Sequence, residues 1–226
     1  MIKPLYLLAD SQLLFQQGEN GLPSRIRADL ASDPKAAYIG ASNDDNPEFY
    51  ALFKAAMEIM NVSQCRMVPA QLTDEDNAFL QEADLMVLAG GDVERGWHAF
   101  EQNGVKELIS RRRYEGTTLV GVSAGAVQLG VGALTHAPQP KTLDLFRLAP
   151  FYVGAHDEEA EWFDLRALVN LAQPEARGIG IPAGGGAVYC ADGTLEPIRR
   201  PLIELVKTNH GLREGLLLPS NLAAGA

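Results

Sequence analysis

The stretch TTLVGVSAGAVQLG, residues 117–130, runs from an apolar, β-branched segment into a run of small and aliphatic residues. Its first half is typical of a buried strand, and its second half is compatible with a helix. Between them, residues 121–125 match the pattern G-x-S-x-G, which can place a serine on a sharp turn between a strand and a helix. The stretch therefore poses a choice for Ser123, which is either an exposed nucleophile or an ordinary serine of a glycine-rich loop.

The same alternation of strand and helix patterns extends on both sides of this stretch. Between the strands, residues 48–60 repeat apolar side chains at the spacing of one helix face, and Thr73 with Asp76 can cap a second helix. A third helix pattern, GVKELISRRR (104–113), ends in three arginines, where cations complement a helix C-terminus. The face of the first helix consists of Phe49, Leu52, Phe53, Ala56 and Met60. The strand candidates before Ser123 are PLYLLA (4–9), AAYIGAS (36–42), CRMVPA (65–70) and DLMVLAGGD (84–92).

This alternation predicts an α/β fold with three layers, in which helices cover both faces of a mostly parallel central sheet. The length of 226 residues suits a single domain over residues 1–226. Past residue 140 the pattern loosens. There we expect a strand ending at His156 (144–156), a helix over 158–172 and a hairpin (186–198) that turns at Asp192-Gly193.

In a parallel sheet, ligands bind outside the carboxyl ends of the strands. Three loops follow strand candidates and should share that edge: NDDN (43–46), GGDVERGW (90–97) and SAGA (123–126). We assign Asn43, Gly90 and Asp92 to substrate binding. The Gly90-Gly91 pair would let the backbone approach a ligand closely, although a tight turn alone would also explain it.

A serine nucleophile needs a base and donors for the developing oxyanion. Of the four histidines, His98 lies at a helix start, His136 in a proline-flanked loop and His210 near the C-terminus. His156 ends a strand candidate at the predicted edge, so we assign it as the base, against the alternative of an ordinary surface or core histidine. The amides of Gly91 and Ala124 are the candidate oxyanion donors.

Composition excludes several other functions. The formal net charge of −10 argues against nucleic-acid binding, and no Walker A or dinucleotide-binding pattern predicts a cofactor. Cys65 and Cys190 lie far apart without metal-ligand spacing, so neither a metal site nor a disulfide is expected.

The start of the chain has too short an apolar run for a signal peptide or a membrane span, which favours a cytoplasmic protein. The end, LLLPSNLAAGA (216–226), either contacts a partner subunit in a homodimer or frays.

The GGD at 90–92, the GVSAGA at 121–126 and the histidine at 156 together resemble peptidase family S51, the group of aspartyl dipeptidase (peptidase E) and cyanophycinase. The resemblance extends from the first strand through GIGI (178–181). It implies the class I glutamine amidotransferase-like (flavodoxin-like) fold and a serine hydrolase that cleaves a small peptide, isopeptide or amide. In that scheme Ser123 is the nucleophile, His156 the base, and the amides of Gly91 and Ala124 form the oxyanion hole.

The sequence departs from the family at two places. The acidic residue expected just after the GIGI strand is absent, and Pro182 and Ala183 stand there. The basic segment expected after the histidine is replaced by DEEAEWFDLRAL (157–168), so a neutral or cationic substrate is favoured over an acidic one. Among the other acids, Asp157 suits a helix start, whereas Asp92 and Glu94 remain open as contacts of the substrate or the histidine. None of them is assigned as a replacement.

Three functions remain open at this point. The first is a serine hydrolase of the S51 type. The second is a catalytically impaired binding protein that keeps the cleft but lacks the triad acid. The third is an α/β-hydrolase-type esterase, which would need an acid and then a histidine after Ser123, together with an HGGG-type loop that this chain does not contain.

Overall fold

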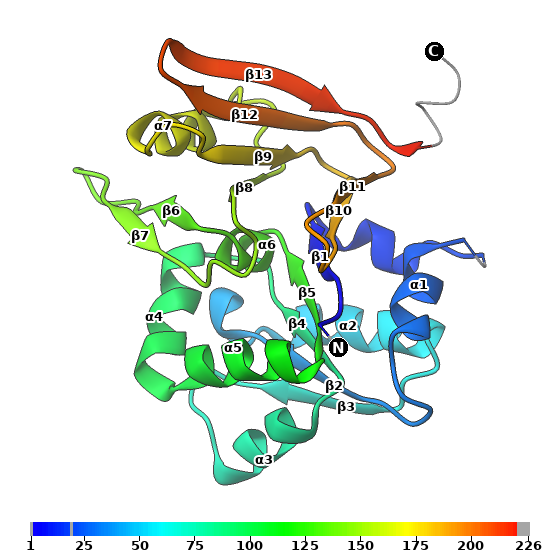
Figure 1. The fold of residues 1–226 in the computed structure, drawn as a ribbon. Coiled ribbons are helices and arrows are strands. Elements are labelled where there is room, and N and C mark those ends of the chain that lie inside the picture. The colour runs from blue at the N-terminus through cyan, green and yellow to red at the C-terminus, as the bar shows by residue number, and fades with distance from the viewer. Residues whose placement is uncertain (1, 19, 221–226) are drawn as a thin grey trace.

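A computed structural model of the protein describes residues 2–18 and 20–220, so the last six residues of the predicted tail segment lie outside the described part. The main sheet has seven strands in the order β11-β10-β1-β5-β4-β2-β3 (Figure 1). The five strands from β1 to β3 in this order run parallel, and the β10–β11 hairpin adds to β1 in the antiparallel direction. The strands are β1 (Leu5–Leu8), β2 (Lys35–Ile39), β3 (Gln64–Val68), β4 (Leu85–Leu88), β5 (Thr118–Val122), β10 (Gly186–Tyr189) and β11 (Leu195–Ile198).

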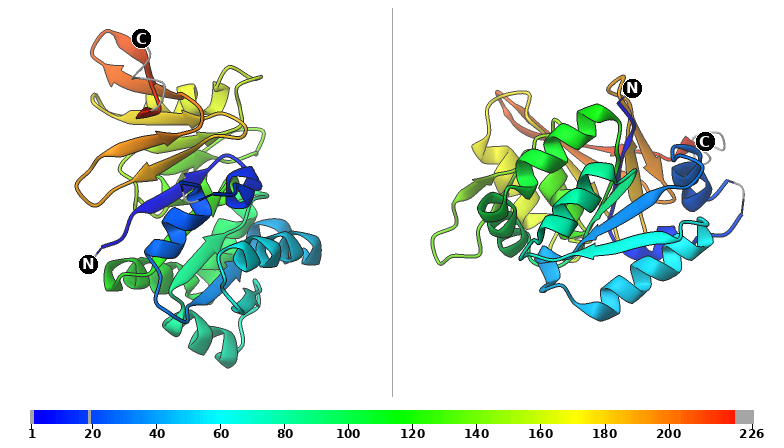
Figure 2. Two further views of the ribbon diagram at one scale, coloured as in Figure 1. Left: turned by 90° about the vertical axis from the view of Figure 1, so that its right-hand side faces the viewer. Right: turned by 90° about the horizontal axis from the view of Figure 1, so that it is seen from below.

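Alternate side chains of each central strand enter opposite cores. Leu5 and Leu7 of β1 pack with the helices on one face, whereas Tyr6 and Leu8 pack with those on the other. One face is covered by α3 (Asp74–Glu82), α4 (Val93–Asn103), α5 (Val105–Glu115) and α6 (Ala124–Leu129). The other face is covered by η1 (Ser11–Phe15), α1 (Leu22–Ala28) and α2 (Pro47–Ile59). The helices flank the sheet on both sides (Figure 2), which confirms the predicted three-layer, mostly parallel architecture.

A second sheet, which the sequence did not predict, has the order β13-β12-β9-β8 and stands beside the end of the main sheet (Figure 1). Its β8 and β9 pair in parallel, and β12 and β13 form an antiparallel hairpin. One hydrophobic core includes side chains from both sheets, among them Leu88 and Leu119 of the first and Val153 and Ile181 of the second. The remaining elements are β8 (Tyr152–Ala155), β9 (Arg177–Ile181), β12 (Leu202–Thr208), β13 (Gly211–Leu217), the pair β6 (Gly132–Leu134) and β7 (Thr142–Asp144), the short η2 (Ala41–Asn43) and α7 (Phe163–Leu171).

Several local predictions are confirmed. The capping box between Thr73 and Asp76 starts α3, and two of the three arginines, Arg112 and Arg113, lie in the last turn of α5. The hairpin turns at Asp192-Gly193, where Gly193 has a φ of 88° and the Asp192 carboxylate accepts hydrogen bonds from Thr194. Within the described residues, no helix combines the length and apolarity needed to cross a membrane.

The predicted helix over 158–172 is too long. The structure has α7 only from Phe163, because Glu161 and Trp162 adopt left-handed backbone conformations with φ of 53° and 60°. The buried Trp162 ring instead packs against Leu165 and Val169 of the helix that follows. The acidic residues after His156 therefore lie on a loop rather than on a helix.

Candidate active site

Ser123 occupies the turn between β5 and α6 in a backbone conformation that serine rarely adopts, with φ of 51° and ψ of −112°. Such strain in a non-glycine residue is often found at functional sites. Ser123 stands at the N-cap position of α6, yet its side chain makes no capping hydrogen bond. Its hydroxyl is consequently free to interact across the cleft.

The two glycines of the motif are required by close backbone packing. A Cβ atom at Gly121 would lie 2.5 Å from the carbonyl oxygen of Gly125. A Cβ atom at Gly125 would lie 2.2 Å from the carbonyl oxygen of Leu88 on the neighbouring strand β4. The turn can be this tight, and α6 can pack this closely on the sheet, only because both positions lack a side chain.

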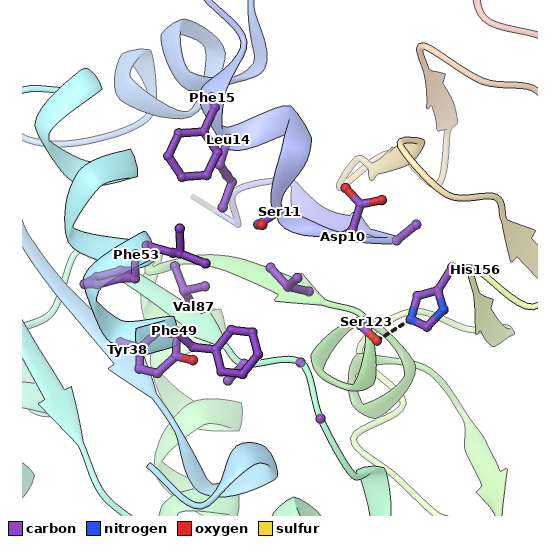
Figure 3. Close-up of a pocket in the computed structure, with 16 residues that line it drawn as sticks. Asp10, Ser11, Leu14, Phe15, Tyr38, Phe49, Phe53, Val87, Ser123 and His156 are labelled. Atoms are coloured by element: carbon purple, nitrogen blue, oxygen red, sulfur yellow. Dashed lines mark hydrogen bonds between the residues drawn. The ribbon is translucent and has the colours of Figure 1, made fainter. Parts of the chain in front are cut away.

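The Ser123 hydroxyl meets the His156 imidazole, with Oγ 2.8 Å from Nε2 (Figure 3). His156 directly follows β8, and its amide extends the pairing with β9 by donating to the carbonyl oxygen of Ile181 at 2.8 Å. The nucleophile candidate thus comes from the main sheet and the base candidate from the second sheet. The structure brings these two predicted residues together at hydrogen-bonding distance.

The other three histidines do not contact the serine. His98 is half-exposed within α4 beside Glu94 and Glu101. The amide of His136 donates to Glu94, and His136 lines a hollow that Ser123 and His156 also line. His210 lies in the turn between β12 and β13.

The Gly90-Gly91 loop faces the serine. A Cβ atom at Gly90 would lie 3.3 Å from the Cβ atom of Ser123. Gly91 has a φ of 135°, and a Cβ atom there would lie 2.1 Å from the carbonyl oxygen of Ser42, so only glycine fits. Among the described residues, no acceptor bonds the amide of Gly91 or of Ala124, which leaves both amides available as donors.

Asn43 and Asp92 use their polar atoms within the loops. The Asn43 amide nitrogen donates to the Tyr38 hydroxyl at 2.8 Å, and its oxygen accepts from the Asn46 amide. The Asp92 carboxylate accepts from the Arg95 amide at 2.9 Å and so caps α4. Of the three residues assigned to substrate binding, Gly90 is the one that the structure brings beside Ser123.

No carboxylate orients the imidazole within the described part of the chain. The ion pairs there that involve a histidine ring are those of His98, and none includes His156. After β9, where the acid was expected, Ala183 instead donates its amide to Glu158 at 3.0 Å. The next residue, Gly184, donates its amide to Asp10 at 2.6 Å.

The far side of the His156 ring borders a shallow acidic depression. Burial, reinforced by the charge of Asp164, raises the pKa of Asp157, while the neighbouring His156 acts in the opposite direction. Within the described residues, no three His, Cys, Asp or Glu side chains are grouped to hold a metal ion. The residues around the depression are Asp10, His156, Asp157, Glu158, Glu159, Ala160 and Ala183.

A cavity of about 280 Å³ opens on the other side of Ser123, and sequence reasoning did not predict it (Figure 3). Its wall combines residues of η1, α2 and the ends of β2, β4 and β5. Phe49 and Leu52 belong to the apolar face that the sequence predicts for α2, whose other members are buried. They are instead 49% and 46% exposed and line this cavity.

Comparison with known proteins places the chain in a family. The sequence pattern of peptidase family S51 matches residues 5–197. A peptidase from an acI-B1 actinobacterium has a similar structure, with a TM-score of 0.66 and 16% identity over 97% of this chain and 96% of that one. A protein assigned as a peptidase E from Listeria monocytogenes EGD-e has a TM-score of 0.65 and 16% identity, over 88% of this chain and 100% of that one. No curated protein matches the sequence. Because the family pattern covers most of the chain, this protein belongs to peptidase family S51.

Proposed function

We propose that the protein is a serine-type hydrolase that cleaves a small peptide, isopeptide or amide through an acyl-enzyme on Ser123. Membership of the S51 family supports a peptidase-type function. The observation that carries the proposal is the 2.8 Å contact between Ser123 Oγ and His156 Nε2, beside two amides that donate to no acceptor among the described residues. This contact lies within the distance that proton transfer from a nucleophile to its base requires.

The proposed reaction has two halves. His156 Nε2 takes the hydroxyl proton while Ser123 Oγ attacks the scissile carbonyl, and the amides of Gly91 and Ala124 donate to the oxyanion. His156 then returns the proton to the leaving amine as the carbon–nitrogen bond breaks, which leaves an ester on Ser123. Water, deprotonated by His156, hydrolyses this ester and regenerates the hydroxyl.

Within the described residues, no carboxylate forms an ion pair with the His156 ring, which favours a second candidate, a catalytically impaired binding protein with the same cleft. In serine proteases the acid fixes the imidazole tautomer and stabilises the imidazolium, and its loss costs about 10⁴-fold in rate. A serine and a histidine that act without an acid therefore predict slow substrate turnover rather than none. An esterase of the α/β-hydrolase type is not supported, because the chain belongs to peptidase family S51 and its sequence contains no HGGG-type oxyanion loop.

A fluorophosphonate probe separates the two candidates. A hydrolase reacts with it at Ser123, which intact mass and peptide mapping detect, and the Ser123→Ala variant does not react. His156→Gln should slow the labelling while leaving the fold unchanged by circular dichroism. If the wild-type protein is not labelled between pH 6 and 9 although it is folded, the hydrolase proposal fails and the binding protein becomes the better description.

A further inference from the structure

The cavity beside Ser123 has an apolar floor and walls. Tyr38 and Phe53 are buried at its far end, where their rings pack at 5.3 Å between centroids, and Val87 lies beside them (Figure 3). Leu14 and Phe15 of η1 form the opposite wall. The cavity reaches Gly90, Gly91 and Ser123 at its other end, so a group that fills it would be attached close to the reacting carbonyl.

Two of the polar side chains in the lining, Tyr38 and Asp10, already have partners. The Tyr38 hydroxyl accepts from Asn43. Asp10, the one carboxylate of the described lining, accepts from the amides of Gln12 and Gly184 at 2.9 and 2.6 Å. No lysine or arginine of the described residues lines the cavity. An acidic side chain of a substrate would therefore lose its hydration here without finding a cation.

Phe49 and Leu52 place large apolar side chains in water at the mouth of this cavity. Two such residues one helical turn apart on α2 are usually buried, and the rest of their apolar face is. Because they line the cavity, a group bound there would cover them, and concave sites lined by apolar and aromatic side chains are typical of ligand pockets.

We propose that this cavity is the specificity pocket for an aliphatic or aromatic group next to the scissile bond, so that the substrate class is a neutral, hydrophobic peptide or amide. This inference rests on the proposed hydrolase function of Ser123. The volume of about 280 Å³ suits it. An engineered apolar cavity of about 150 Å³ binds benzene, and pockets for larger ligands begin at about 300 Å³. One side chain or short alkyl group therefore fits, whereas an extended ligand does not.

The first test measures how fast fluorophosphonates with different chains label Ser123. We expect the probe with a hexyl chain to label Ser123 at least about 10-fold faster than the probe with an ethyl chain. It should also react at least about 10-fold faster than probes whose chains have the same length as hexyl but end in a carboxylate or an ammonium group. Phe49→Asp should abolish most of the hexyl preference. Leu171→Asp is the matched control, because Leu171 is also an exposed apolar residue on a helix but does not line the cavity. Melting curves verify that both variants fold.

The second test needs no reaction. Saturation-transfer NMR on the Ser123→Ala protein should detect N-acetyl-phenylalanine amide in preference to N-acetyl-aspartate amide and N-acetyl-lysine amide, and Phe49→Asp should remove the signal. Labelling that is equally fast for all chains would overturn the pocket assignment while the hydrolase proposal stands. Absence of any labelling, together with selective binding of the phenylalanine amide, would refute the hydrolase and retain the pocket. A preference for the charged amides would refute the pocket.

Discussion

The Nε2 atom of His156 lies 2.8 Å from the Oγ atom of Ser123, although the two residues are 33 positions apart and follow strands of different sheets. The contact forms because β5 and β8 both end at the cleft and α6, which directly follows Ser123, packs against β8. The proposed catalytic pair is therefore a product of tertiary packing between two sheets.

If Ser123 and His156 act as one catalytic unit, the losses of activity caused by substituting each of them should not add in the double variant. We expect Ser123→Ala to lower kcat/KM for a hydrophobic amide by about 10²–10⁴-fold, His156→Gln by a similar factor, and the double variant by no more than the larger single loss. Steady-state kinetics on the three variants measure this. Losses that multiply in the double variant would show that the two side chains act independently.

An acid placed after β9 should raise the rate. Ala183 borders the same depression as His156, so Ala183→Asp brings a carboxylate to the place after β9 where the family resemblance predicts an acid. We expect kcat/KM to rise by about 10-fold or more, within the range of about 10⁴-fold that an orienting acid supplies in serine proteases.

Ala160→Asp is the control for this substitution, because it adds the same charge to the same depression from the loop after His156. It should change kcat/KM far less, since added charge alone does not orient the ring. Equal gains from the two variants would show that negative charge, and not an orienting partner, limits the reaction.

Asp157 should make stability depend on pH. Burial raises its pKa in the folded protein, so the folded state holds this proton more tightly than the unfolded chain does. The folded state consequently loses stability as the pH rises through the interval between the ordinary Asp pKa of about 3.9 and the raised value. Asp157→Asn should raise the Tm at pH 7 and leave it nearly unchanged below pH 3.5. A larger gain at acid pH would contradict the assigned direction.

Gly91 should tolerate no side chain. In Gly91→Ala the Cβ atom would lie 2.1 Å from the carbonyl oxygen of Ser42, and the residue would have to keep a positive φ. We therefore expect the free energy of unfolding to fall by at least about 2 kcal/mol. Most of the activity should be lost as well. Gly104→Ala isolates the backbone strain, because Gly104 has a φ of +76° and no atom of the described residues lies within 4 Å of an added Cβ atom there. This variant should lose about 1 kcal/mol in the free energy of unfolding. Gly215→Ala, in open space without a positive φ, should be nearly neutral. Urea denaturation of the three variants measures these differences.

The main sheet could be predicted because its strands are continuous apolar runs separated by well-marked helices, as in LVGV before Ser123. The second sheet could not, although strands were expected over 144–156 and at GIGI (178–181), because β8 and β9 are short and rich in glycine and nothing in them indicates a separate sheet. Of the strand expected over 144–156, only Tyr152–Ala155 forms β8. Gly154, Gly178 and Gly180 lack side chains where Trp162 and Leu165 pack against the sheet, so the strand pattern is interrupted by the same residues that make room for the packing. The helix start at Phe163 was missed because the left-handed conformation of Trp162 has no local sequence signal.

The serine, the histidine and the glycine loop could be proposed from their positions after strand candidates. The cavity could not, because Phe49 and Leu52 have the same spacing as the buried residues of α2. Helical periodicity shows which side chains share a face, but it does not show where a covering layer ends. Leu14 and Phe15 are an apolar pair in the sequence, and only the fold shows that they close the opposite wall.

The interface between the two sheets affects how this protein loses activity on heating. Gly130 lies at this interface, where an added Cβ atom would be 2.9 Å from the carbonyl oxygen of Phe151. The end of α6 and the segment that leads to β8 are therefore in contact without an intervening side chain. A small slip along this contact would separate the hydroxyl from the imidazole while every strand stayed paired. We therefore expect thermal inactivation to precede the loss of secondary structure, with reactivity reporting on the fit of the two sheets before any spectroscopic sign of unfolding.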